Sequence, residues 1–352
     1  MITNKMEKIR TYKGFDKDLR CRGFQYEVGK DYEENNIQLC KKGFHACESP
    51  MEVWDHYDML DSRYCEVEQS GDLQREDNTT KICSSRIKII AELKLSDIIK
   101  IGVEWILNKT SPKNVKAGNN SGDSAKIGSS GYSAKIGSSG DSAKIGSSGY
   151  SAKIGSSGYY AQIGSSGYYA QIGSSGDYAQ IGSSGDSAKI GSSGYYAKIG
   201  SSGDYAQIGS SGYSAKIGSS GYYAKIGSSG YSAKIGSSGD SAKIGSSGYY
   251  AKIGSSGDYA QIGSSGYSAK IGSSGDYAQI DSTGEDCVIC CAGNNSIAKA
   301  KVGSWITLSE WVYDTNKNRP IPKCVKTEYV DGERIKGDTW YKLVDGEFKE
   351  EK

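Results

Sequence analysis

The sequence predicts a mainly β protein, in which a β-solenoid of nonapeptide repeats lies between a small α+β N-terminal domain and a small β C-terminal module. First, the nonapeptide Gly-Ser-Ser-Gly-(Asp/Tyr)-(Ser/Tyr)-Ala-(Lys/Gln)-Ile recurs eighteen times within residues 119–280. Second, its Ile recurs every nine residues, and an Ala precedes each Ile by two positions. Third, the flanking segments lack the repeat and carry strand, helix and hairpin signals. The expected domains are therefore residues 1–112, 113–303 and 304–352.

The repeat is expected to form one short strand and one corner. Alternation along a strand of about five residues, (Asp/Tyr)-(Ser/Tyr)-Ala-(Lys/Gln)-Ile, places Ala and Ile inside and the Ser/Tyr and Lys/Gln positions outside. Gly-Ser-Ser-Gly then forms the corner, with the Asp/Tyr position at its mouth. Two units make one coil, and nine stacked coils make a rod of roughly 43 Å. A flexible Gly/Ser linker is the alternative, but it requires neither an invariant Ile nor an invariant Ala.

The outer positions follow a rule of their own. Ser at the Ser/Tyr position is always followed by Lys, and Gln appears only after Tyr. Stacked lysines repel one another, whereas Gln and Tyr ladders do not, so the pattern could simply relieve charge. The functional alternative is a surface that binds a flat or anionic partner. Its candidate ligand-binding residues are Tyr160, Tyr169, Tyr178, Tyr196, Tyr205, Lys198, Lys225, Gln162 and Gln180.

Composition limits the partners and the compartment. The chain of 352 residues has a net charge of +2, and the array carries twelve Lys and eight Asp. This gives little support to nucleic-acid binding and argues against an acidic DNA mimic. The first residues lack the apolar core of a signal peptide, and no run is long enough to span a membrane. The lack of such a run predicts no membrane partner. Nine cysteines without an export signal predict reduced thiols in a cytoplasm.

The N-terminal domain is expected to alternate strands with two helices. Ser49 as N-cap, Pro50 at the first position and Glu52 in a capping box predict a helix that reaches residue 60. Ser96 is expected to cap a second helix that Pro112 ends. Residues 71–80 are polar and predict a loop. The expected strands are residues 10–15, 25–32, 37–40, 63–69 and 87–95.

The chain after the array predicts a cap and two hairpins. Residues 281–303 resemble a degraded repeat in which Ile289 keeps the nine-residue period. Residues 305–312 predict a strand, and Asp331-Gly332 and Asp345-Gly346 are hairpin signals. A module of fewer than 50 residues is expected to pack on the cap or on the N-terminal domain. Solenoid edges can stack end to end, so self-association stays open unless the caps are effective.

No motif points clearly to metal or catalytic chemistry. Cys21, Cys40, His45 and Cys47 are zinc-ligand types but lack a C-x-x-C pair, which favours structural cysteines. The calcium-binding nonapeptide G-G-x-G-x-D-x-U-x does not match, because Ser replaces the second Gly and ten of eighteen units carry Tyr. We therefore expect no metal, no cofactor and no catalytic residue. Tyr12 and His45 are the candidates for a pocket in the N-terminal domain.

Several segments resemble an uncharacterised family of proteins from phages, prophages and gut bacteria. The resemblance covers roughly the first 110 and the last 60 residues, and it implies a phage-related product in the cytoplasm of a bacterial host, without an established activity. Tyr12–Phe15, Gly43–His45 and Tyr57 are also loosely similar in layout to ADP-ribosyltransferases, with no catalytic residue transferred. The segments that carry the family resemblance are Cys21–Gly29, Gly43–Cys47, Gly303–Ile306, Asp331–Ile335 and Asp338–Val344.

Two functions follow as hypotheses. The first is a non-catalytic binding or scaffold rod that contacts a protein or a small anionic or flat ligand through Tyr/Lys/Gln ladders, in a phage setting that includes counter-defence. The alternative is an N-terminal enzyme that uses the solenoid as an oligomerisation or spacer stalk. Substitution of the outer tyrosines is expected to impair a binding rod but not an enzyme. Substitution around Tyr12 and His45 is expected to impair an enzyme.

Overall fold

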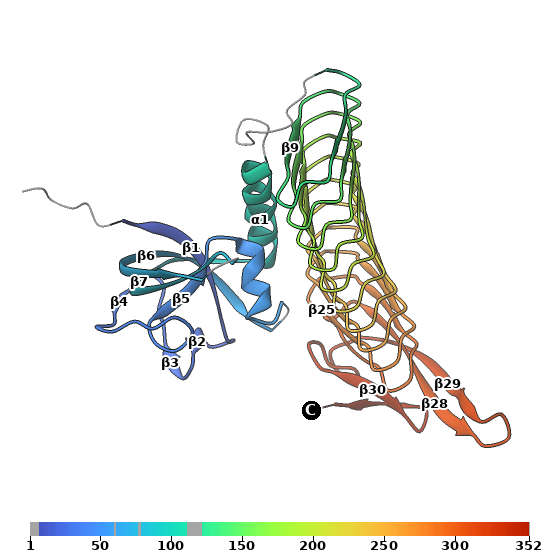
Figure 1. Ribbon diagram of the computed structural model, residues 1–352. Helices are drawn as coiled ribbons and strands as arrows, with labels where there is room; N and C mark the ends of the chain where they lie inside the picture. Colours follow the sequence, from blue (N-terminus) through green and yellow to red (C-terminus); the bar gives the residue numbers. More distant parts are fainter. Residues whose placement is uncertain (1–6, 60, 77–78, 111–121, 352) are drawn as a thin grey trace, which may run out of the picture. The chain divides into compact units, whose positions relative to one another are not determined.

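The computed structural model describes residues 7–59, 61–76, 79–110 and 122–351 (Figure 1). The chain divides into one unit that ends at Trp105 and a second unit that begins at Ile106. The first is a small β domain with two helices, and the second contains the solenoid and its C-terminal cap. The prediction of a mainly β protein built around a solenoid is confirmed. Pro112, the predicted end of the second helix, lies outside the described residues.

The strands of the first unit form a closed ring with one added edge strand. Antiparallel pairings join β1 to β6, β6 to β7, β7 to β5 and β5 back to β1, while β4 extends the sheet from β7. Phe15, Val67, Ile87 and Ile89 fill the interior. The strands are β1 (Ile9–Phe15), β2 (Arg20–Cys21), β3 (Phe24–Gln25), β4 (Asp31–Glu33), β5 (Phe44–Cys47), β6 (Arg63–Arg75) and β7 (Lys81–Leu93).

Three predictions for this unit are wrong. Residues 25–32 do not form one strand, because Gly29 has a positive φ of 87° and separates β3 from β4. Residues 37–40 make only an isolated bridge between Gln38 and Lys42. Part of the predicted loop at 71–80 belongs to β6, which continues to Arg75 through two register shifts. A shift adds residues to one strand without ending the pairing, so polar composition does not mark the strand's end.

The first helix is also shorter than predicted. Pro50–Asp55 forms a 3-10 helix, η1, and Ser49 makes no side-chain cap hydrogen bond. The expected capping box fails because the Glu52 carboxylate instead accepts hydrogen bonds from the backbone N–H (2.7 Å) and the hydroxyl (2.5 Å) of Thr80. The second helix, α1 (Leu95–Thr110), is confirmed, but its predicted cap is wrong: Ser96 lies inside the helix, and the Asp97 carboxylate accepts the N–H of Lys94 at 3.1 Å. Gly102 lets α1 approach Met51 of η1 closely.

Each coil of the solenoid contributes one strand to each of two parallel sheets. Each strand has the sequence (Lys/Gln)-Ile-Gly-Ser and pairs in register with the strand eighteen residues along the chain, for example Lys216 with Lys234. We call the sheet that begins with β8 the open sheet and the other the second sheet. The open sheet holds β8 (Lys126–Ser129), β10 (Lys144–Ser147), β12 (Gln162–Ser165), β14 (Gln180–Ser183), β16 (Lys198–Ser201), β18 (Lys216–Ser219), β20 (Lys234–Ser237), β22 (Lys252–Ser255) and β24 (Lys270–Ser273).

The second sheet contains the alternate strands of the same coils. Its members are β9 (Lys135–Ser138), β11 (Lys153–Ser156), β13 (Gln171–Ser174), β15 (Lys189–Ser192), β17 (Gln207–Ser210), β19 (Lys225–Ser228), β21 (Lys243–Ser246), β23 (Gln261–Ser264) and β25 (Gln279–Ser282). The predicted burial of Ala and Ile is confirmed, since both line the core that runs between the sheets.

The strand lies further along the repeat than predicted. The first Gly and first Ser extend the strand, and the corner is Ser-Gly-(Asp/Tyr)-(Ser/Tyr). In most of the second sheet the buried Ser favours this phase, because its Oγ accepts the N–H of the corner Gly, as Ser228 does from Gly230 at 3.3 Å. In the open sheet, the buried Oγ atoms of Ser201, Ser219, Ser237, Ser255 and Ser273 have no partner among the described residues, so this bond does not explain the phase there. The tyrosines therefore lie at the corners, and the outer face of each strand presents Lys or Gln and then Gly. The predicted corner position of Asp/Tyr is confirmed.

The two glycines of each repeat meet different surroundings. A Cβ on the corner glycine Gly230 would lie 1.9 Å from the carbonyl oxygen of Gly212 in the preceding coil. The same short approach recurs at the corner glycines from Gly140 to Gly293. By contrast, a Cβ on the strand glycine Gly236 would meet nothing within 4 Å. The corner glycine is thus required by the stacking of coils, and the strand glycine of the open sheet is not.

The C-terminal module closes the end of the solenoid. Ile289 pairs with Ile271, so the nine-residue period continues past the last perfect repeat as predicted. A hairpin of β28 and β29 ends the open sheet, and a hairpin of β30 and β31, turned at Asp345-Gly346, ends the second. Asp331-Gly332 joins no hairpin; the Asp331 carboxylate instead accepts the N–H groups of Glu333 and Ile335. The strands are β26 (Val288–Cys291), β27 (Ile297–Lys299), β28 (Trp305–Asp314), β29 (Arg319–Tyr329), β30 (Tyr341–Val344) and β31 (Glu347–Glu350).

The cap should lose stability in acid through Glu328. Arg334, and then Lys326, bind this carboxylate, and they lower its pKa to about 2. A depressed pKa stabilises the fold above the unfolded value of about 4.3, and this contribution disappears as pH falls towards about 2. Glu328→Gln is expected to cost about 1–3 kcal/mol at pH 7 and to flatten the dependence of stability on pH between 5 and 2. Denaturant titrations at several pH values measure this, with the exposed Glu333→Gln as the control; equal slopes in both variants would contradict it.

Candidate functional site

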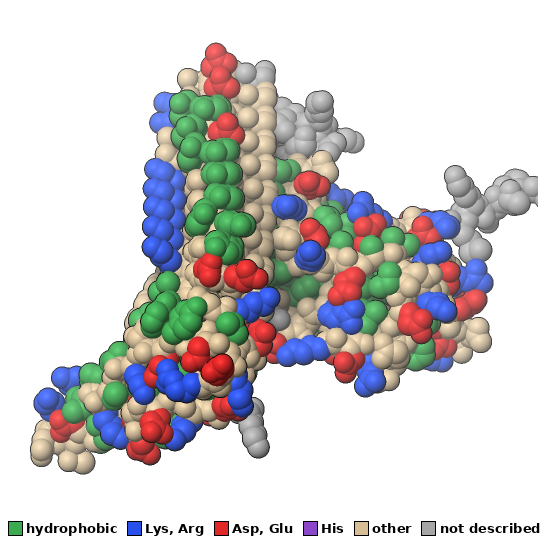
Figure 2. Space-filling model, turned by 180° about the vertical axis from the view of Figure 1, so that it is seen from behind, with side chains coloured by type: hydrophobic (Ala, Val, Ile, Leu, Met, Phe, Trp, Pro, Cys, Tyr) green, Lys and Arg blue, Asp and Glu red, His purple; other side chains and the backbone are tan. Residues whose placement is uncertain are grey.

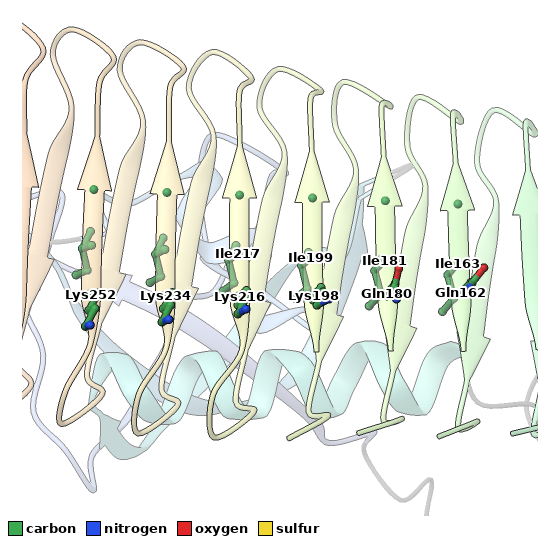
Figure 3. Close-up of a pocket in the computed structure, with 18 of the residues that line it drawn as sticks. Gln162, Ile163, Gln180, Ile181, Lys198, Ile199, Lys216, Ile217, Lys234 and Lys252 are labelled. Atoms are coloured by element: carbon green, nitrogen blue, oxygen red, sulfur yellow. The ribbon is translucent and has the colours of Figure 1, made fainter. Parts of the chain in front are cut away.

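Five lysines form an uninterrupted column on the outer face of the open sheet. Successive strands lie about 4.8 Å apart in a sheet, and these side chains occupy the same position of five neighbouring strands (Figure 3). All five are exposed, and within the described residues none forms an ion pair or a hydrogen bond. Like charges at this spacing destabilise a sheet. We call this column the lysine ladder: Lys198, Lys216, Lys234, Lys252 and Lys270.

A column of stacked tyrosines precedes the lysine ladder in the same five coils. Each ring belongs to the corner residue three positions before a ladder lysine, as Tyr231 does before Lys234. Ring centroids lie 4.8–5.5 Å apart, and three of the four pairs are within 13° of parallel. Figure 2 shows a column of basic side chains beside a column of hydrophobic ones along the rod. We call these rings the tyrosine ladder: Tyr195, Tyr213, Tyr231, Tyr249 and Tyr267.

A row of bare glycines lies on the other side of the lysine ladder. These glycines are exposed, and no atom lies within 4 Å of the position that a Cβ would take. Together with the Lys and Gln column they floor a shallow groove of about 1510 Å³ along the open sheet. Glycine weakens a strand, and in a strand interior it often marks a place where another molecule approaches closely. We call this row the glycine shelf: Gly182, Gly200, Gly218, Gly236 and Gly254.

The carboxylates at the corners beyond the glycine shelf are already engaged by the backbone. Asp204 accepts the N–H of Tyr222 at 2.9 Å, Asp240 that of Asp258 at 2.9 Å, and Asp258 that of Asp276 at 2.8 Å. Each bond joins one coil to the next, which explains why Asp suits this corner position. These acids therefore hold the coils together, and within the described residues none of the three forms an ion pair with the lysine ladder.

The structure divides the sequence-predicted ligand residues among four surfaces. Lys198, Gln162 and Gln180 share the column of the lysine ladder, whereas Lys225 lies on the second sheet. Tyr160, Tyr178 and Tyr196 stack on one another at the corner that leads into the open sheet. Tyr169 and Tyr205 occupy the opposite corner. The nine residues thus do not form one surface.

Sequence reasoning missed four ladder lysines, the tyrosine ladder and the glycine shelf. The signal lies in the eighteen-residue period of the coil rather than the nine-residue period of the repeat. Aligned at eighteen residues, five consecutive lines carry both Tyr at the first variable position and Lys three residues later. This alignment also shows that the pattern does not relieve charge here, because the five lysines follow one another directly.

A second candidate site lies in the N-terminal unit. A cavity of about 1050 Å³ is lined by both predicted pocket residues, Tyr12 and His45, and by Lys13, Cys21 and Tyr57. The His45 ring is held on both sides: Nδ1 faces the carbonyl oxygen of Gly43 at 3.1 Å, and Nε2 accepts the N–H of Cys40 at 2.9 Å. Burial lowers the pKa of His45 and raises that of Tyr12. The backbone contacts of both ring nitrogens fix His45 in the cavity wall and make it a poor metal ligand.

The comparisons with known proteins concern this unit alone. Residues 9–101 match the domain of unknown function DUF7666. The match spans β1 to β7 of the DUF7666 domain and the beginning of α1, and is consistent with the expected uncharacterised family. No curated protein matches the chain, and no solved structure does.

Two further findings concern the chemistry of the described residues. Among them, no group of three or more His, Cys, Asp or Glu side chains is arranged to hold a metal ion. No helix in the same part of the chain has the length and apolar composition needed to cross a bilayer. All nine cysteines lie in the described residues and none forms a disulfide; Cys47, Cys65, Cys83, Cys287 and Cys291 are buried.

Proposed function

We propose that the solenoid is a non-catalytic binding rod whose open sheet holds a linear polyanion along the lysine ladder. The observation that carries this proposal is the register of five exposed lysines, which pair with no described residue, with five tyrosines and an open glycine floor. A polyanion would neutralise charges that destabilise the free sheet. The glycine shelf would let the ligand approach the backbone, and the tyrosine hydroxyls would offer hydrogen bonds along its edge. A second copy of the same face would be repelled by its own lysines.

The tyrosine geometry favours a polyanion that is recognised without base stacking. Single strands of nucleic acid gain affinity by stacking bases on the faces of aromatic rings. Here the three inner rings of the ladder have a neighbouring ring on each face, so they present edges and hydroxyls instead. An acidic polysaccharide, which carries regular charges and hydroxyl groups, fits this surface better. The resemblance noted above supports a phage-related setting in a bacterial cytoplasm, and counter-defence by sequestration of a polyanion belongs to the same proposal.

Replacing ladder lysines by glutamine tests the proposal with a substitution that the array itself uses. Gln162 and Gln180 occupy this column naturally, so the triple variant Lys216→Gln, Lys234→Gln, Lys252→Gln should fold normally. Each lysine near an anionic surface contributes about 1 kcal/mol, so heparin affinity should fall roughly 100-fold. The slope of log affinity against log salt should fall by about 2. Titration calorimetry with heparin and with oligo(dT) measures both quantities.

The matched control changes the same charge elsewhere. Lys189→Gln, Lys225→Gln, Lys243→Gln on the second sheet is expected to weaken heparin binding less than threefold. Equal losses in the two triple variants would show that net charge, and not the ladder, binds the probe. Tighter binding of oligo(dT) than of heparin at equal salt would overturn the assignment to an unstacked polyanion.

The enzyme alternative rests on a different observation. Lys13 is buried beside the cavity of the N-terminal unit and donates a hydrogen bond to Tyr57. A binding rod would not require a buried lysine at this place. Under this alternative the solenoid would be a spacer or oligomerisation stalk, and the ladder variants would leave the activity of the N-terminal unit unchanged.

A further inference from the structure

A buried lysine of the DUF7666 domain lacks the carboxylate partner that a buried ammonium group normally needs. Lys13 in β1 is only 4% exposed. Its Nζ donates to the carbonyl oxygen of His45 at 3.0 Å and to the Tyr57 hydroxyl at 2.9 Å. Within the described residues, no Asp or Glu forms an ion pair with it. Burial disfavours the charged ammonium form, and it lowers the pKa of Lys13.

The tyrosine beside this amine is placed by the backbone. Gly14 follows Lys13, and a Cβ there would lie 2.3 Å from Cγ of Tyr57, so the ring packs directly on the strand. The Tyr57 hydroxyl also lies 3.3 Å from Sγ of Cys21. Burial, followed by the hydrogen bond with Cys21, raises the pKa of Tyr57, which keeps the phenol protonated. A neutral amine and a phenol proton donor therefore meet at the cavity wall.

We propose that Lys13 is the nucleophilic amine of a site that binds a small aldehyde or ketone as an imine, with Tyr57 as the proton donor. Desolvated lysines with a nearby proton donor are suited to this chemistry. The cavity that both residues line is large enough for such a molecule, and the packed rings of Phe24, Tyr26 and Tyr32 give it an apolar wall.

The step balances without any further reagent. The lone pair of Lys13 Nζ forms a bond to the carbonyl carbon, while the C=O π electrons move to oxygen and that oxygen takes the phenol proton of Tyr57. The nitrogen then returns a proton to the phenolate, which gives a neutral carbinolamine. A second proton from Tyr57 lets the hydroxyl leave as water while the C=N bond forms. The iminium nitrogen restores the phenol proton, so one carbonyl compound and one amine give one imine and one water.

Reductive trapping on the full-length protein tests the proposal. Propanal and cyanoborohydride at pH 7 convert each imine to a stable propyl-lysine, which peptide mapping by mass spectrometry assigns to its residue. We expect the initial rate at Lys13 to be at least tenfold that at exposed Lys198, which serves as an internal reference in the same molecule. A rate at Lys13 equal to or below that at Lys198 overturns the proposal.

Two variants make the result specific. Tyr57→Phe keeps the ring against Gly14 and removes only the hydroxyl, so the rate at Lys13 should fall at least fivefold while the rate at Lys198 stays the same. An unchanged rate at Lys13 in this variant would remove Tyr57 from the mechanism. Lys13→Met should abolish the fast label alone. Heparin binding should be unaffected in both variants, which separates this proposal from the function proposed for the rod.

Discussion

Gly230→Ala is expected to destabilise the solenoid by at least about 2 kcal/mol, whereas Gly236→Ala should stabilise it by about 0.5 kcal/mol. The two residues are six positions apart in the same array. At Gly230 the new methyl group would lie 1.9 Å from the carbonyl oxygen of Gly212, and backbone of both coils would have to move. At Gly236 the methyl group would enter open space, and the unfolded chain would lose conformational freedom.

Chemical denaturation followed by circular dichroism measures both effects. Gly218→Ala, at the equivalent strand position of the preceding coil, should behave like Gly236→Ala. Gly248→Ala, at the next corner of the same edge, should behave like Gly230→Ala. If alanine has the same effect on stability at both kinds of glycine, close stacking of the corners does not explain why the second glycine of the repeat is needed.

Deletion of one repeat should leave the solenoid folded but sharply weaken heparin binding, whereas deletion of two repeats should keep most of the binding. Both strands of a coil have the same sequence and bury the same Ala and Ile, so either deletion closes without a break in the core. Removal of residues 222–230 moves every later strand to the other sheet. Lys234, Lys252 and Lys270 then leave the column of Lys198 and Lys216, where Lys243, Gln261 and Gln279 take their places. The run of five lysines becomes a run of three, and the tyrosine ladder divides.

Removal of residues 213–230 takes out a whole coil and only shortens the ladder by one lysine. This deletion removes Lys216 and Lys225, whereas the single-repeat deletion removes Lys225 alone. The larger deletion therefore loses more positive charge yet is expected to retain the tighter binding, by roughly tenfold. Titration of both deletion variants with heparin at one salt concentration measures the order of their affinities. An affinity order that follows net charge would rule out recognition by an aligned ladder.

The periodicity of the sequence was sufficient to predict the solenoid, its two-strand coil and its Ala and Ile core. The phase of the strand was wrong, because each strand also includes the first Gly and the first Ser of the next unit, and in most of the second sheet a hydrogen bond from the corner Gly to that Ser stabilises this arrangement. In the N-terminal unit, local signals such as Ser49 and Glu52 predicted a longer helix, but Thr80 from a distant strand end takes the Glu52 carboxylate. Tertiary partners of this kind leave no mark on a short stretch of sequence.

The candidate sites were harder to predict than the fold. Tyr12 and His45 both line a cavity, but Lys13, which lines the same cavity and donates to the carbonyl oxygen of His45, carried no motif. Its significance comes from burial and from the absence of a carboxylate among the described neighbours, which only three-dimensional packing determines. On the solenoid, individual tyrosines were named, but a ligand surface requires a column, and these candidates were chosen without aligning the repeats at the predicted coil length of eighteen residues.

The pairing of strands into coils also has a consequence for how such a gene diversifies. Recombination between near-identical repeats adds or removes units one at a time, while the fold counts them in twos. An exchange of an even number of units changes only the reach of each surface column. An exchange of an odd number joins the upper half of one column to the lower half of the other and creates two new surfaces from unchanged parts. A lineage can therefore alter what its rod presents without a single amino-acid substitution.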